Sequence, residues 1–430
     1  MNSKTNPFIM ASNVNITSKG IRKVLRLYNE KQALAEYIWN GFDAKADTIL
    51  IDYTFNALGS IESLKVADNG YGINFSLLKD KFNPFYESEK ALEQSIHLHK
   101  STMHGKNGVG RLTFFTFAHA AEWNTTYEEN GQFKNGSIKV AVGELNNYEA
   151  KLLNEDLKEK TTGTTVSFSN VQLSKEAMEL SIIPYLQAEF CWFLELHKSR
   201  GFSIVINGEP LVYQDNIMDQ EDDLVFRYPE SNTTFKVKFI QWKESLHKEL
   251  SKNYFINHKG QEVYKDYTTL NKKADEYYHS VFIESEFFDE FDFSSTDYEA
   301  QVKLYARTKS SPEYKFLIKK VNELLRAKRK PFLKEFSSKL MEKYALEGVL
   351  PVFSEEEASQ KTDLIETLKV MYELQPKLFS GLSIDQKKAF VRFTHVLLNS
   401  NQRPQLFQVI EGIVELEAEE KEELMSFLAG

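Results

Sequence analysis

The chain has little of several features that mark particular classes of protein. Cys191 is the single cysteine among 430 residues, which excludes an internal disulfide framework and a multi-cysteine zinc site. Its apolar neighbours, Phe190, Trp192 and Phe193, indicate a buried thiol in a reducing compartment.

Long apolar runs are also absent from the sequence. No uncharged apolar run reaches the roughly 18 residues that a membrane span needs. The N-terminal residues show no basic region followed by an apolar one, so no secretory signal is visible. These absences predict a cytoplasmic protein without a membrane partner.

Positive charge is not in excess, because 53 Lys and Arg stand against 62 Asp and Glu, with a net charge of −9. Any contact with nucleic acid must therefore come from a local patch. The densest basic cluster, "RAKRKPFLK" at 326–334, is either such a patch or a solvated helix end. Apolar residues are plentiful at 42%, so the chain can bury sizeable cores in two or three domains.

The alternation of strand and helix patterns predicts an α+β fold in three regions, 1–222, 223–345 and 346–430. In the first region we expect strands at 47–55, 64–68 and 164–170 and a hairpin at 202–213 that turns at Asn207-Gly208. The acidic run "DQEDD" (219–223) is interpreted as the boundary. The segment after Gly110 reads as a buried helix.

The second region is expected to hold strands at 235–242, 253–260 and 280–287. A long helix from Glu313 to Tyr344 should follow, interrupted at Pro331 because proline lacks the N–H that a helix needs. The third region is helical and poor in glycine.

Three polar residues recur along one predicted helix, "ALAEYIWNGFDAKA" (33–46). Glu36, Asn40 and Asp43 are spaced to share one stripe, opposite Leu34 and Ile38. The simpler interpretation is a face exposed to solvent. The alternative is a site, because a carboxylate one turn from an amide oxygen can hold a hard cation and an attacking water.

Two glycine-rich segments follow this helix. In "VADNGYGIN" (66–74), Asp68 is followed closely by Gly70 and Gly72, which suits either a hairpin turn or a binding loop. In "HGKNGVGRLTFFTFA" (104–118), glycines precede an apolar segment, an arrangement that lets backbone N–H groups meet phosphate.

The order of these parts, completed by "TTGTTVSF" (161–168), resembles the GHKL ATPases: gyrase, the ninety-kilodalton heat-shock chaperone, histidine kinases and MutL. Within that superfamily it looks most like the MutL and MORC branch. The matching motifs extend from residue 20 to about 170. The resemblance implies a Bergerat-type ATP-binding α/β sandwich over 1–222, a transducer-like α/β domain over 223–345 and a helical connector or dimerisation region over 346–430.

The resemblance also implies a Mg²⁺-dependent ATPase with ATP as its ligand. By that resemblance Asp68 accepts the adenine amino hydrogen, Asn40 binds Mg²⁺ and Glu36 polarises the hydrolytic water. The other implied nucleotide-binding residues are Asp43, Gly70, Gly72, Gly105, Lys106, Asn107, Gly108, Val109, Gly110, Arg111 and Thr164. The span from about 75 to 104 would be an ATP lid. Bulky Trp39 and Phe42 depart from the usual pattern, as does Arg111, which either touches phosphate or caps the lid.

Hydrolysis in this superfamily usually uses a cation from the following domain. The loop "YARTKSSPEYKFLIKKV" resembles the loop that carries it in MutL relatives, with Lys309 as the candidate and Arg307 as the runner-up. A plain surface lysine before a helix cap is the alternative for Lys309.

The predicted function is an ATPase whose nucleotide cycle closes a homodimeric clamp, in DNA repair or defence against foreign DNA. The alternative is an ATP-dependent scaffold or chaperone-like regulator that does not hydrolyse ATP. Double-stranded DNA and a nuclease-like effector, in the same chain or a separate one, are the candidate partners. The C-terminal region, with its glutamate-rich segment 411–423, would be a connector of an N-terminal fragment or a dimerisation tail.

Overall fold

The structure is a computed structural model. It describes residues 17–79, 110–154, 161–246, 249, 251–270, 275–293 and 307–400, and a few single residues after Ser400. The chain divides into two compact units, which are described separately. Unit 1 comprises Met1–Asn216 with Gly260–Glu262, and unit 2 comprises the remainder from Ile217 onwards.

Unit 1 is built on an eight-stranded sheet in the order β5-β4-β3-β6-β2-β1-β7-β8. Only the β1–β7 pair is parallel among the pairings of this sheet. Ile49 and Ile51 of β1 are buried whereas Leu50 and Asp52 are exposed, so alternation sets which face is covered. The strands are β1 (Thr48–Phe55), β2 (Ile61–Asp68), β3 (Ala120–Glu129), β4 (Gln132–Ala141), β5 (Glu149–Asn154), β6 (Gly163–Ser169), β7 (Ser203–Ile206) and β8 (Glu209–Pro210).

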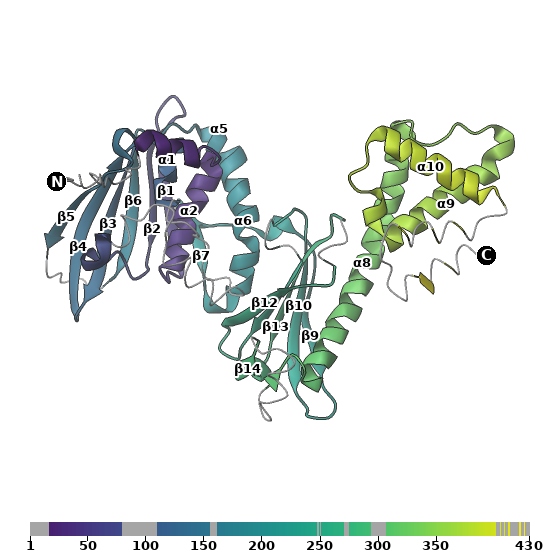
Figure 1. Cartoon of the computed structure of the whole chain (residues 1–430). Helices are drawn as coiled ribbons and strands as arrows, with labels where there is room; N and C mark the ends of the chain where they lie inside the picture. Colours follow the sequence, from purple (N-terminus) through teal and green to yellow (C-terminus); the bar gives the residue numbers. More distant parts are fainter. Residues whose placement is uncertain are drawn as a thin grey trace, which may run out of the picture. The chain divides into compact units, whose positions relative to one another are not determined.

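Helices α2 (Glu30–Asp43) and α6 (Ile183–Leu196) pack side by side against this sheet (Figure 1). Aromatic rings fill their interface, where Trp39 and Phe42 of α2 contact Phe190 and Phe193 of α6. The bulky residues that depart from the family pattern therefore serve helix packing. The remaining short helices of unit 1 are α1 (Ser18–Leu25), η1 (Phe75–Leu77), η2 (Gly110–Thr116), η3 (Val142–Glu144), α5 (Lys175–Ala177), η4 (Met178–Ile182), η5 (Lys198–Arg200) and η6 (Gln214–Asn216).

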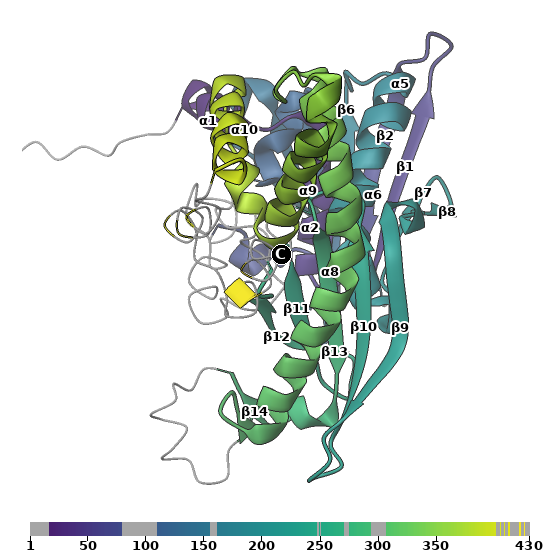
Figure 2. The same cartoon turned by 90° about the vertical axis from the view of Figure 1, so that its right-hand side faces the viewer.

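Unit 2 begins with a five-stranded sheet in the order β12-β11-β13-β10-β9. Its strands are β9 (Ile217–Arg227), β10 (Thr234–Trp242), β11 (Lys252–Ile256), β12 (Glu262–Tyr267) and β13 (Tyr278–Glu284). The 3₁₀ helix η8 (Glu286–Phe288) is followed by the short parallel pair of β14 (Phe291–Asp292) and β15 (Arg307–Thr308). The long helix α8 (Pro312–Leu346) comes next. Figure 2 shows α8 running along the face of β10 and β13.

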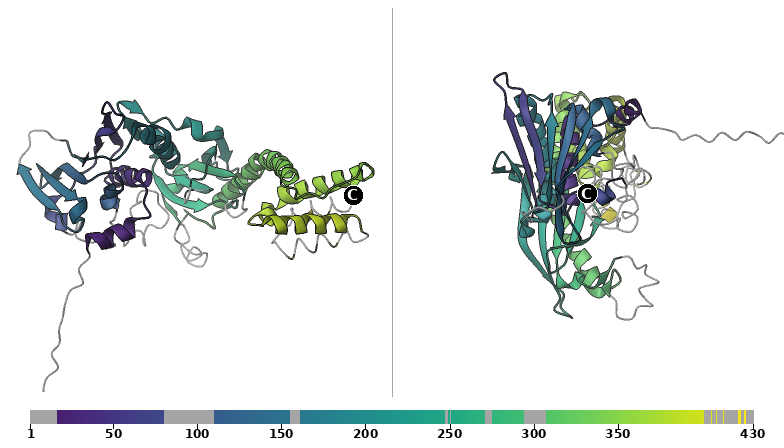
Figure 3. Two further views of the ribbon diagram at one scale, coloured as in Figure 1. Left: turned by 90° about the horizontal axis from the view of Figure 1, so that it is seen from above. Right: turned by 90° about the vertical axis from the view of Figure 1, so that its left-hand side faces the viewer.

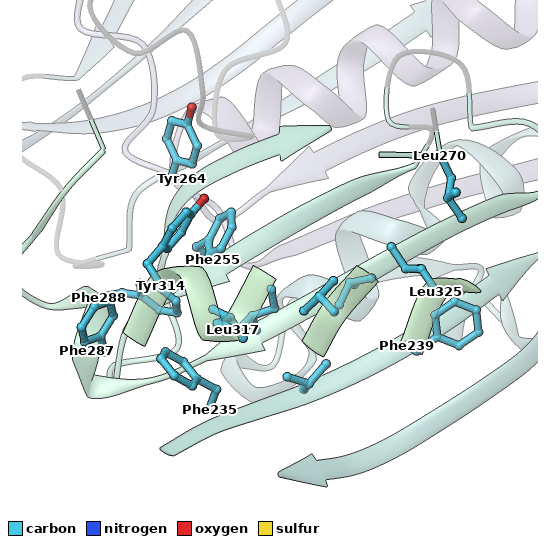
Figure 4. Close-up of a cluster of buried hydrophobic side chains, with 14 of the residues drawn as sticks. Phe235, Phe239, Phe255, Tyr264, Leu270, Phe287, Phe288, Tyr314, Leu317 and Leu325 are labelled. Atoms are coloured by element: carbon cyan, nitrogen blue, oxygen red, sulfur yellow. The ribbon is translucent and has the colours of Figure 1, made fainter. Parts of the chain in front are cut away.

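Helix α8 takes part in two hydrophobic cores. Its first half packs on the sheet through Tyr314, Leu317, Val321 and Leu325, together with the phenylalanines seen in Figure 4. Its second half packs with the C-terminal helices through Leu333, Met341 and Tyr344. Those helices are η9 (Glu355–Glu357), α9 (Ala358–Leu374), η10 (Pro376–Phe379) and α10 (Ile384–Leu398), with α9 and α10 side by side (Figure 3).

The strands and the hairpin predicted from sequence are present, and Asn207 and Gly208 both have positive φ at the hairpin turn. The α+β class and the helical C-terminal region are confirmed. Three local predictions differ from the structure. The first concerns "DQEDD", interpreted from sequence as the boundary: Asp219 and Glu221 pair in register with β10 inside β9, and the two units divide slightly earlier, between Asn216 and Ile217. The predicted boundary at 222 therefore falls within a strand.

The other two errors concern helices. Helix α8 continues through Pro331, because Leu325 before it and Leu333 after it are both held in cores that outweigh a lost hydrogen bond. The segment after Gly110 forms the 3₁₀ helix η2 and then enters β3. In η2 the Thr113 and Thr116 hydroxyls donate to carbonyls three residues earlier, which favours the tighter turn.

Candidate functional site

Helix α2 carries the three polar residues that the sequence singled out. It begins with a capping box, in which the Asn29 side chain accepts from the Gln32 N–H and the Gln32 side chain accepts from the Asn29 N–H. Glu36, Asn40 and Asp43 are half-buried, and every other residue from 36 to 43 is fully buried. After the accessible first turn of α2, this stripe is the accessible face of the described helix, and the other residues from 33 to 43 are enclosed.

Asp68 lies at the end of β2, where the chain turns sharply. The Gly70 N–H donates to Asp68 Oδ1 at 2.9 Å, and Gly72 has a φ of +74°. A Cβ at Gly70 would collide with the Ala44 carbonyl oxygen beside α2, and one at Gly72 would collide with the Thr126 carbonyl oxygen. The turn therefore requires glycine at both positions, since the backbone itself packs against its neighbours.

Asn69 has a different role in the same turn. Its side-chain oxygen accepts from the N–H groups of Asp47 and Thr48, both at 3.1 Å, and its amide donates to Asp47 at 2.8 Å. Asn69 thus fixes the start of β1. Within this motif, Asn69 therefore has a structural role, whereas Gly70 and Gly72 allow the backbone of the turn to pack closely against its neighbours.

The carboxyl group of Asp68 is strongly perturbed by its surroundings. Burial raises the pKa of Asp68 to about 6, and hydrogen bonds from the backbone at Gly70 and Thr164 oppose that rise. Thr164 lies directly opposite Asp68 in the β2–β6 pairing. Among the described residues the carboxylate of the half-buried Asp68 is held by uncharged donors, so its oxygens can accept a hydrogen from a ligand.

A second threonine in this region was not predicted from the sequence. The Thr125 hydroxyl of β3 lies 3.0 Å from the Thr164 hydroxyl and accepts from the Ile73 N–H at 2.8 Å. Thr125 is buried, and it joins β3, β6 and the glycine turn. The sequence indicates Thr125 only weakly, as a polar residue at an inward-facing position of a strand whose residues alternate between buried and accessible.

The opposite end of the α2 stripe meets the last glycine of the predicted phosphate loop. A Cβ at Gly110 would collide with Oε2 of Glu36, so the backbone of Gly110 lies against that carboxylate. Gly105, Lys106, Asn107, Gly108 and Val109 lie outside the described residues, as does most of the predicted lid. Burial lowers the pKa of the half-buried Arg111 to about 10, which leaves it protonated at neutral pH.

Both ends of the site are thus arranged along one helix. Gly110 meets α2 at Glu36, and Gly70 meets it at Ala44, eight residues later. At about 1.5 Å per residue, the backbones of Glu36 and Ala44 are roughly 12 Å apart along the helix axis. Gly41, between them, leaves room for Asp68, because a Cβ there would lie 3.0 Å from the Asp68 Cβ.

Residues 28–170, which include α2, the Asp68 turn, η2 and Thr164, match the family model described as "Histidine kinase-, DNA gyrase B-, and HSP90-like ATPase". This region is a GHKL-type ATPase domain. No match to a curated protein was found.

Two solved structures are similar to the chain at low identity. One is the ATPase region of Saccharomyces cerevisiae topoisomerase II, with 14% identity over 59% of this chain and 72% of that chain, at a TM-score of 0.33. The other is the same region bound to ICRF-187 (dexrazoxane), with 13% identity over 59% and 73% and the same TM-score.

Lys309, the predicted catalytic cation, lies in unit 2, outside the ATPase domain match. Its Nζ donates to the Tyr264 hydroxyl at 3.0 Å and lies 3.5 Å from Asp266 Oδ2. These partners raise the pKa of Lys309 although its partial burial opposes the rise. The guanidinium of Arg307 lies 5.4 Å from the ring centroid of Phe287. Lys309 is therefore a half-buried cation held by Tyr264 and Asp266, and its catalytic role stays a prediction.

The basic cluster at 326–334 is partly used within unit 2. Lys328 Nζ lies 2.9 Å from Glu221 and 3.1 Å from Asp219. Arg329 is buried and forms an ion pair with Asp275 at 2.6 Å. The sequence offered a phosphate-binding patch or a solvated helix end for this cluster, whereas Lys328 and Arg329 form ion pairs within unit 2.

In the part of the chain that the structure describes, no helix is long and apolar enough to cross a membrane. No group of three or more His, Cys, Asp or Glu side chains there could hold a metal ion. A metal at Asn40 would accordingly depend on ligands other than a protein cluster of this kind, such as phosphate oxygens and water.

Proposed function

We propose that the ATPase domain binds ATP with Mg²⁺ and hydrolyses it. The observation that carries this proposal is the pairing of two features on α2: Gly110 lies against the Glu36 carboxylate, and Asp68 lies beside Gly41, five residues further along the helix. At about 1.5 Å per residue, the base-binding residue and the phosphate end are separated by roughly 7.5 Å along the helix axis, which suits different parts of one nucleoside triphosphate.

The residues at the Asp68 end fit an adenine base. The Asp68 carboxylate can accept a hydrogen from an exocyclic amino group, and the glycine turn allows a flat ring to approach the backbone. The Thr164 hydroxyl, held by Thr125, is a further donor or acceptor at the same place. Asp43, half-buried on α2, would line this side.

The residues at the Glu36 end fit the triphosphate. Asn40 would supply an amide oxygen to Mg²⁺, which when bound neutralises charge on phosphate oxygens. Gly110 offers backbone close to Glu36, and Arg111 is a protonated neighbour of that backbone. Glu36 would accept the proton of the attacking water as general base.

A nucleotide titration tests the base-binding role. Asp68→Asn keeps the shape of the side chain but replaces one acceptor oxygen by an NH₂ donor. Because the adenine amino group is also a donor, we expect the affinity for an ATP analogue to fall by about 100-fold or more in calorimetry. Asp52→Asn, the same change at an exposed position of β1, is the matched control and should bind normally. Retained affinity in Asp68→Asn would contradict the site assignment.

We further propose that ATP closes a homodimer, as the MutL- and MORC-like resemblance implies, with DNA repair or defence as the setting. The support is the motif order in the sequence and the transducer-like unit that follows. Light scattering with and without a non-hydrolysable analogue tests the dimer, and an unchanged monomer mass would refute it. Turnover measured with and without double-stranded DNA tests the DNA partner.

The C-terminal helices support a connector or dimerisation role more than a catalytic one. Residues 346–400 form helices around one apolar core, with Leu364, Leu368 and Val391 fully buried. We propose that a nuclease-like effector, in the same or a separate chain, is the partner of this region. The 430-residue chain alone should then cut no DNA with any nucleotide or metal, and metal-dependent cleavage would overturn the connector proposal.

A further inference from the structure

Tyr37 lies next to Glu36 on α2 but points into the protein. Its side chain is 4% exposed, and its ring meets Phe168 of β6 edge-on with centroids 4.9 Å apart. Trp123 of β3 lies on the same side at 6.4 Å. A phenylalanine would satisfy this apolar environment equally well, so packing does not account for the hydroxyl group.

The Tyr37 hydroxyl is used at the start of η2. It donates to the carbonyl oxygen of Arg111 at 2.8 Å, across 74 positions of sequence. Its oxygen also takes part in a hydrogen bond with the backbone at Phe114, and burial holds the pKa of Tyr37 far above its usual value. The hydroxyl therefore remains protonated and can donate throughout the physiological pH range.

The neighbouring residue at the start of η2 is fixed in a similar way. The Thr113 hydroxyl donates to the carbonyl oxygen of Gly110 at 2.7 Å. Two consecutive carbonyls, those of Gly110 and Arg111, are thus held by side-chain hydroxyls. Gly110 is the residue whose backbone lies against the Glu36 carboxylate.

We propose that Tyr37 is a positioning residue whose hydroxyl fixes the start of η2 so that the Gly110 backbone stays against Glu36. Adjacent residues of one helix then have complementary tasks: Glu36 faces the reaction, and Tyr37 holds the backbone that faces Glu36. This inference deepens the proposed function and rests on it for its catalytic part.

The anchor can be tested without nucleotide. Tyr37→Phe keeps the ring and removes one hydrogen bond, so the backbone amides of 110–117 should exchange with deuterium about tenfold faster. Tyr213→Phe is the matched control, because it removes the hydrogen bond between another buried tyrosine of unit 1 and Glu195. That variant should leave exchange at 110–117 unchanged. Equal exchange in Tyr37→Phe and the unmodified chain would overturn the anchor.

The catalytic part needs a readout that a purely structural role would not change. We expect Tyr37→Phe to lower kcat about tenfold while KM for ATP changes less than about threefold. In a Glu36→Gln background, Tyr37→Phe should cause no further loss, because the residue acts through Glu36. Losses that multiply in the double variant would overturn the positioning role.

The two proposals can fail separately. Absence of turnover in the unmodified chain would overturn the proposed hydrolysis and the catalytic role of Tyr37 together, while the exchange measurement would still decide the anchor. Normal kcat in Tyr37→Phe, with turnover in the unmodified chain, would overturn the inference alone.

Discussion

The half-buried carboxylate of Asp68 in unit 1 and the buried carboxylates of Asp275 and Glu249 in unit 2 are stabilised differently. In unit 1, Asp68 is held by backbone N–H groups, and its pKa is raised to about 6. In unit 2, Asp275 meets Arg329 at 2.6 Å, and Glu249 receives Lys252, Lys265 and the Tyr254 hydroxyl. A carboxylate paired with a cation stabilises the fold. A carboxylate held only by uncharged donors keeps a negative charge that can bind a hydrogen-bond donor of a ligand.

The largest expected effect is that of replacing Glu36. If this effect is absent, the functional role that the comparison gives to the carboxylates of unit 1 is wrong. Glu36→Gln keeps the size of the side chain but cannot accept a proton. Turnover of ATP should therefore fall by about 10²–10⁴-fold, with nucleotide affinity nearly unchanged. Steady-state kinetics and calorimetry check both parts. Glu62→Gln, at an exposed position of β2, is the control, and full turnover in Glu36→Gln would remove Glu36 from its role.

The structural half of the comparison is tested at Arg329. Arg329→Leu leaves Asp275 buried without its cation, so the free energy of unfolding should fall by about 3–5 kcal/mol. Urea denaturation measures this change. Lys330→Leu, one residue further and exposed, should change stability little. A small loss in Arg329→Leu would show that Asp275 finds another partner and that the ion pair is not essential to the fold.

Lys309 would be an exception to the comparison, because it is a paired cation of unit 2 for which the sequence predicts a catalytic role. Lys309→Ala should lower turnover by about 10²-fold, the usual effect of removing one donor to a developing charge, without loss of nucleotide affinity. Lys315→Ala, an exposed lysine of α8, serves as the control. Normal turnover in Lys309→Ala would assign the cation elsewhere, with Arg307 tested next.

The last effect has the opposite sign. The pKa of Asp68 is raised on folding, so its contribution to stability is present below pH 4 and is lost as the pH rises through about 6. Asp68→Asn carries no charge and should therefore be more stable than the unmodified chain at pH 8, by up to about 3 kcal/mol. This gain should vanish near pH 4. Thermal unfolding at both pH values measures it, and a loss of stability at pH 8 would contradict the uncompensated charge.

Much of the site could be predicted from sequence because its residues are close together along the chain. The turn after Asp68 and the stripe on α2 each depend on spacing within eight residues, and such local patterns predict local structure well. Strands β1 and β6 of unit 1 could also be predicted from the sequence, because their residues alternate between apolar and polar.

The features that sequence reasoning missed depend on contacts between distant residues. Tyr37 and Arg111 are 74 positions apart, and Thr125 and Thr164 are 39 apart, so no local pattern reports their hydrogen bonds. The "DQEDD" run was interpreted as a domain boundary because its cations, Lys238 and Lys328, come from other elements. Charge density alone cannot distinguish a solvated loop from a strand whose partners arrive later in the chain.

The continuity of α8 has a consequence for how unit 2 loses its structure. Phe332, beside Pro331, packs against both the sheet core and the helical core, so neither core is complete without the same stretch of helix. The sheet and the C-terminal helices should consequently melt in a single cooperative transition. A chain shortened at residue 345 would leave Met341 and the fully buried Tyr344 in water, because the side chains that cover them come from α9 and α10.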